Sequence, residues 1–179
     1  MTRRYERRTA VSFMQKHNAN DLITLFNDLF SHVENTVLIG GVEEPLYLPV
    51  DDTAMFNRVY FTRDYFASAL HEIAHWCLAG VERRQLVDYG YWYYPEGRSL
   101  EQQRLFERAE VKPQAIECLF ARAAQSRFLV SKDDFSNRCD EGPESFETLV
   151  FAQAERYLLA GLPVRAALFR NRLLEFYGV

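Results

Sequence analysis

Residues 68–80 read SALHEIAHWCLAG, and this stretch sets two histidines four residues apart, with a glutamate directly after the first. Apolar residues recur at helical spacing around it, so a helix is predicted from about residue 63 to 79, ending at Gly80. Residues i and i+4 lie one above the other on a helix. His71 and His75 therefore point from one face, where two ring nitrogens are able to hold one metal ion.

The first half of the chain predicts a small sheet next to this helix. A helix is expected over residues 20–31, and three short β-like runs follow at 36–40, 45–49 and 58–62, separated by turn signals such as Gly40-Gly41. Short strands joined by short turns are typical of an antiparallel sheet. The fold class is therefore α+β, a mostly helical single domain with a small antiparallel sheet and a metal-binding helix in a zincin-like arrangement.

Three further helices are predicted in the second half. Ser99 and Gln102 fit a capping box that opens the first of them, and Pro113 predicts a kink or a new start within it. The other two are expected over residues 144–160 and 163–177.

Composition and charge restrict the class of protein. The chain has 179 residues, of which 48% are hydrophobic, and a net charge of −4, so we expect no direct contact with nucleic acid. Apolar runs stay well below the roughly 18 residues that span a membrane, and no signal-peptide core follows the first residues, which favours a cytoplasmic protein without membrane contact. The three widely spaced cysteines are expected to be reduced thiols.

The first 16 residues of the chain are rich in arginine. Four arginines fall within residues 1–16, which are expected to form a flexible basic arm ahead of one domain over residues 17–179.

A metal ion held by two histidines needs a third ligand, and no other histidine lies nearby in the sequence. The next long helix offers Glu110 and, one turn earlier, Glu107. We take Glu110 as the third ligand. Glu107 is then expected to support a ligand or to contact the charge of a substrate.

Two histidines and one carboxylate suit two different chemistries. With zinc and a bound water they form a peptidase site, in which Glu72 is the general base. With ferrous iron the same three ligands leave positions open for dioxygen. Residue spacing alone does not decide between them, although Glu72 favours the peptidase.

Several longer segments resemble one known family. EPLYLP at 44–49, HEIAHWCLAG at 71–80, RRQLVDYGYWYYPEGR at 83–98 and FERAEVKPQA at 106–115 are similar, in this order and spacing, to the bacterial elongation factor P hydroxylases. The likeness covers about residues 20–175.

The resemblance implies a non-haem, iron-dependent oxygenase that hydroxylates the lysyl-modified lysine of translation elongation factor P. It implies Fe(II) as cofactor, dioxygen as co-substrate and His71, His75 and Glu110 as metal ligands. Glu72 becomes a catalytic residue of open role: it orients water or dioxygen, or holds the substrate ammonium. We expect Asp88, Tyr91 and Glu107 to bind the cationic substrate side chain. A zinc peptidase and a binding module with a structural metal remain the alternatives.

Overall fold

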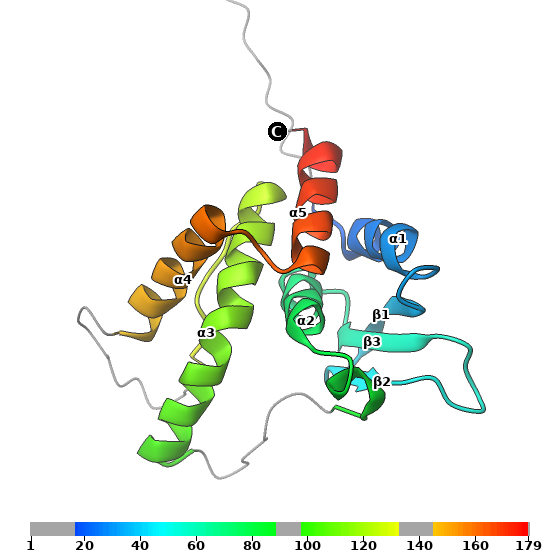
Figure 1. The fold of residues 1–179 in the computed structure, drawn as a ribbon, viewed down its shortest axis with the longest axis horizontal. Helices are drawn as coiled ribbons and strands as arrows, with labels where there is room; N and C mark the ends of the chain where they lie inside the picture. The colour runs from blue at the N-terminus through cyan, green and yellow to red at the C-terminus, as the bar shows by residue number, and fades with distance from the viewer. Residues whose placement is uncertain (1–16, 89–97, 133–144, 179) are drawn as a thin grey trace, which may run out of the picture.

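The histidine-bearing helix, α2 (Phe66–Leu78), lies between a three-stranded sheet and the long helix α3 (Leu100–Ala123) in a computed structural model of the protein (Figure 1). The structure describes residues 17–88, 98–132 and 145–178. The basic arm and Tyr91, with most of the aromatic loop around it, lie outside the described residues. The remaining elements are α1 (Ala19–Phe30), β1 (Thr36–Val42), β2 (Leu46–Leu48), β3 (Asn57–Thr62), a 3-10 turn η1 (Arg83–Gln85), α4 (Phe146–Ala160) and α5 (Val164–Tyr177).

One apolar core holds α2 in place from several sides. The buried side chains of α2 pack with those of α1, β1, β3, α3 and α5, and they are Ala69, Leu70, Ile73, Ala74, Trp76 and Cys77. Helix α4 covers the opposite side of α3 (Figure 1). The predicted α+β class is confirmed, and the two histidines occupy the side of α2 that the core does not cover.

The sheet is mixed, so the antiparallel sheet predicted from the sequence is wrong. The strand order is β1-β3-β2, with β1 parallel and β2 antiparallel to β3. A parallel pair needs a connection long enough to return the chain to the same end of the sheet. Residues 43–56, which include β2, provide it. Strand β3 takes the centre, and its inward-facing Val59 and Phe61 are buried.

The Gly40-Gly41 pair is a bulge rather than the predicted turn. Strand β1 continues through it to Val42, and the register with β3 shifts between Ile39 and Val42. Gly41 has φ +89°, a left-handed conformation that a side chain would strain. Gly40 is needed for a different reason, because a Cβ there would lie only 2.7 Å from the ring of Phe61.

Helix α3 begins as predicted and continues past the expected restart. Ser99 and Gln102 form the reciprocal capping box. No new helix starts at Pro113, because proline removes one N–H donor while the buried face that follows it, against α4 and α5, keeps the chain helical. Within the described part of the chain, no helix is both long and apolar enough to cross a membrane.

A side chain from the far end of the chain caps the carboxyl end of α2. The guanidinium of Arg165, on α5, donates hydrogen bonds to the carbonyls of Cys77 and Ala79. It also lies 4.5 Å from the ring centroid of Trp76. A cation there satisfies carbonyls that the helix leaves unpaired and complements the helix dipole. Helix α5 therefore supports α2 at the end of the helix that follows the two histidines.

The bulge gives a direct test of the packing. We expect Gly40→Ala to destabilise the protein by about 1–3 kcal/mol, because the new methyl group collides with Phe61. Gly80→Ala is the matched control, since no atom lies within 4 Å of a Cβ at that position. Urea unfolding of both variants measures the difference. Equal midpoints for the two would contradict the close contact.

Candidate metal centre

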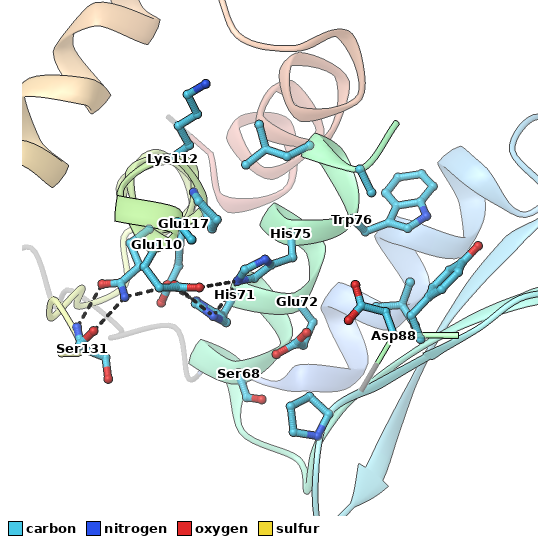
Figure 2. A pocket seen from close by; sticks show the side chains of 18 of the residues that line it. Ser68, His71, Glu72, His75, Trp76, Asp88, Glu110, Lys112, Glu117 and Ser131 are labelled. Atoms are coloured by element: carbon cyan, nitrogen blue, oxygen red, sulfur yellow. Dashed lines mark hydrogen bonds and ion pairs between the residues drawn. The ribbon is translucent and has the colours of Figure 1, made fainter. Parts of the chain in front are cut away.

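Three potential metal ligands meet between α2 and α3. His71 and His75 point from α2 toward Glu110 on α3 (Figure 2). The Nε2 atoms of the two histidines are 3.1 Å apart. Oε1 of Glu110 lies 3.1 Å from Nε2 of His75, and Oε2 lies 3.7 Å from Nε2 of His71. The structure therefore brings the three predicted ligands together.

These distances fit one shared ion. Ligand atoms about 2.1 Å from a common ion are about 3 Å apart when their bonds meet at roughly a right angle. Oε1 of Glu110 is fully buried and makes no hydrogen bond of regular geometry, although Nε2 of His75 lies 3.1 Å away, and a bound metal ion would satisfy this oxygen. The side chain of Glu110 is 1% exposed, against 27% for His71 and 29% for His75, so an ion here keeps one side open to the pocket.

A fourth side chain orients the first histidine. Oε2 of Glu117, two turns along α3 from Glu110, lies 2.8 Å from Nδ1 of His71. When Nδ1 donates its proton to this carboxylate, Nε2 is left as an acceptor that faces the metal position. Glu117 thus selects the ligating tautomer of His71.

The site is electrically suited to a cation. Burial alone would lower the pKa of His71, but the hydrogen bond and charge of Glu117, with the charges of Glu72 and Glu110, raise it to about 9. Burial would raise the pKa of Glu110, yet the two histidines and Gln114 hold it below its usual value. A metal ion would replace the proton that these carboxylates otherwise draw onto the histidines.

A cavity of about 850 Å³ opens beside the three ligands. Helices α2 and α3 line it together with strands β2 and β3, the turn η1, Asp88 and the segment near Ser131. A volume in this range is enough for a long side chain. Glu72 points into this cavity on the side of α2 away from Glu110 (Figure 2). Burial raises the pKa of Glu72, although the two histidines oppose the shift.

The structure separates the substrate-binding residues expected from the sequence. Asp88 lines the cavity and accepts hydrogen bonds from the guanidinium of Arg83 through Oδ2. Glu107 is not among the residues that line the cavity, and it accepts a hydrogen bond from Gln103 instead. Tyr91 lies outside the described residues. Of Asp88 and Glu107, only Asp88 lines the cavity that holds the candidate ligands.

The comparisons with known proteins agree on one family. Residues 25–179 match the family described as elongation factor P hydroxylase. The chain belongs to this family. It is also 48% identical over 164 residues to the elongation factor P lysine hydroxylase of Haemophilus influenzae, a match that covers 91% of each chain.

Sequence reasoning missed two polar residues of this member of the hydroxylase family. On α3, Gln114 comes four residues after Glu110 and Glu117 three residues after Gln114, and all three are buried. Polar residues that recur at helical spacing among apolar ones indicate a buried polar stripe. Extending the search one helical turn beyond Pro113 would have found them.

The role of Glu117 leads to a prediction about metal affinity in this hydroxylase. We expect Glu117→Ala to weaken metal binding by about 10–100-fold, because His71 is no longer held in the ligating tautomer. Glu117→Gln retains an acceptor and should lose less. A competition titration of each purified apo-protein against a chelator measures the effect. The control is Glu155→Gln, which alters an exposed pair with Arg122 and should leave the affinity unchanged. Unaltered binding by Glu117→Ala would refute the assignment.

Proposed function

We propose that the protein is a metal-dependent hydroxylase whose substrate is the lysyl-modified lysine of translation elongation factor P. Membership of the elongation factor P hydroxylase family supports the reaction and the partner. The observation that carries the metal dependence is the cluster of His71, His75 and Glu110 at the wall of a cavity. A substrate that works in translation also favours a cytoplasmic location.

We infer that the metal is Fe(II) and that dioxygen is the co-substrate. Hydroxylation of an unactivated C–H bond needs a redox-active centre with free coordination positions, which ferrous iron held by two histidines and one carboxylate supplies and zinc does not. The histidines come from a helix in an HExxH pattern and the carboxylate from the next long helix, which is the order of ligands in a zincin-like site. The likeness to zincins extends to ligand placement and not to the reaction.

The residues of the chain have separate tasks in this reaction. His71, His75 and Glu110 hold the ion, and Glu117 keeps His71 in the ligating tautomer. The walls between α2, α3 and the sheet enclose the target carbon near the ion and reduce its contact with water. In this proposal the protein positions the target carbon and surrounds it with a medium of low dielectric constant.

A cationic side chain fits the charge of this cavity. Glu72 and Asp88 both line it, and among the described residues no arginine or lysine forms a hydrogen bond or ion pair with Glu72. Burial raises the pKa of Glu72, and a substrate ammonium beside it would favour the charged carboxylate. We propose that Glu72 binds an ammonium group of the substrate and that Asp88 adds negative charge to the same cavity.

A zinc peptidase is not favoured by membership of a hydroxylase family. In a peptidase, Glu72 would act on metal-bound water, and its loss would abolish turnover whatever the substrate concentration. In a hydroxylase that uses Glu72 to hold the substrate, its loss acts on binding instead. The two roles therefore differ in which kinetic constant changes.

The proposed reaction has a simple mass signature. Protein loaded anaerobically with Fe(II) and then exposed to oxygen and a suitable reductant should add one oxygen atom to lysylated elongation factor P. His71→Ala should abolish the addition by removing a ligand. Intact-mass spectrometry of the substrate before and after incubation measures it. An unchanged mass of lysylated elongation factor P after incubation with iron-loaded wild-type protein would contradict the proposal.

The role of Glu72 predicts a selective kinetic change. Glu72→Gln should raise KM for lysylated elongation factor P by about 10-fold or more and lower kcat less, because the neutral amide no longer attracts an ammonium group. Metal affinity should stay near that of the wild type. Steady-state kinetics with a metal titration measures both. Complete loss of kcat at unchanged KM would instead assign Glu72 to the chemical step.

A further inference from the structure

Gln114 joins the metal centre to the wall of the cavity. The side chain of Gln114 is 1% exposed and lies one turn after Glu110 on α3. Its Nε2 donates to Oε2 of Glu110 at 3.2 Å and to the carbonyl of Ser131 at 2.8 Å. Its Oε1 accepts the backbone N–H of Ser131 at 3.0 Å. The amide thus pairs with a peptide backbone as a neighbouring strand would, and has one donor left for the carboxylate.

These contacts fix which way the amide points. If the oxygen and nitrogen of Gln114 were exchanged, the NH₂ group would face the N–H of Ser131, and the oxygen would face both the carbonyl of Ser131 and the carboxylate of Glu110. Donor would then meet donor and acceptor would meet acceptor. The backbone of Ser131 therefore forces an N–H of Gln114 toward Glu110.

The result is a carboxylate with two unlike oxygens. Oε2 of Glu110 receives the N–H of Gln114, whereas Oε1 faces Nε2 of His75 at 3.1 Å and makes no hydrogen bond of regular geometry. An oxygen that already accepts a hydrogen bond is a weaker metal ligand than a bare one. A metal ion at this site would therefore meet Oε1 as the freer oxygen of Glu110.

A second glutamine nearer the start of α3, Gln103, makes a similar set of contacts. Nε2 of Gln103 donates to Oε1 of Glu107 at 3.1 Å and to the carbonyl of Lys132 at 2.9 Å. Gln103 and Gln114 thus make the same kind of bridge between a glutamate of α3 and the backbone of 131–132. Only the bridge from Gln114 ends on a metal ligand.

We propose that Gln114 is a positioning residue that sets the binding mode of Glu110 and couples the metal centre to the substrate cavity at Ser131. This inference rests on the proposed metal-dependent function. Both Leu129 and Ser131 line the cavity, so the segment that Gln114 holds is part of its wall. A metal ion held by Glu110 would fix the position of this carboxylate, and the hydrogen bonds of Gln114 would pass that restraint on to the backbone of Ser131.

Metal affinity separates this role from a structural one. Gln114→Met keeps the length of the side chain and removes the amide, and Gln103→Met is the matched control that removes the other bridge. We expect Gln114→Met to weaken the binding of Fe(II), measured anaerobically against a chelator, by about 10–100-fold, and Gln103→Met to change it by less than about 2-fold. Equal affinity in all three proteins, or an equal loss in both variants, would overturn the inference.

Hydrogen exchange tests the coupling in the wild-type protein and needs no variant to fold. Addition of Fe(II) under anaerobic conditions should slow deuterium exchange at the amide of Ser131, which donates to Gln114. Unchanged exchange at this amide in metal-loaded protein would overturn the coupling. Wild-type protein that holds no metal would refute the proposed function and this inference together, whereas normal metal binding by Gln114→Met refutes this inference alone.

Discussion

The structure of the site depends on two buried carboxylates that face two histidines across the contact of α2 with α3. Glu110 and Glu117 lie in a helix interface where an isolated negative charge is strongly unfavourable. The imidazoles of His71 and His75 compensate them, and their affinity for positive charge is what makes the place suitable for a metal ion. The helices must therefore cross at this point of their lengths, and the rest of the fold serves to hold them there.

The supporting elements act on α2 from its other sides. Strand β3 leads directly into α2 and packs against it, and the Gly40-Gly41 bulge lets β1 approach closely enough to pair with β3. The ring of Trp76 packs against those of Phe26 and Phe30 in the core. A helix fixed on three sides leaves only one open face, which is the face that lines the cavity.

The features that the sequence predicted correctly depend on residues close together in the chain, and those that it did not predict depend on contacts between distant segments. The spacing of His71 and His75 and the capping box at Ser99 are local, so they were read correctly from neighbouring residues. Strand order depends on pairing between distant segments, and the mixed sheet was missed for that reason. Glu107 and Glu110 lie on nearly the same face of α3. Which of the two reaches the histidines depends on where α2 crosses α3, and the pattern of residues along the chain does not give that crossing point.

The cap that Arg165 places on α2 has a consequence for synthesis on the ribosome. All three candidate ligands and Glu117 precede residue 120, so a growing chain carries the complete donor set long before it ends. The arginine that secures the carboxyl end of their helix is made some fifty residues after Glu117. Nascent chains that stop before α5 would carry the candidate ligands on a helix whose carboxyl end lacks this cap, and synthesis of α5 supplies it.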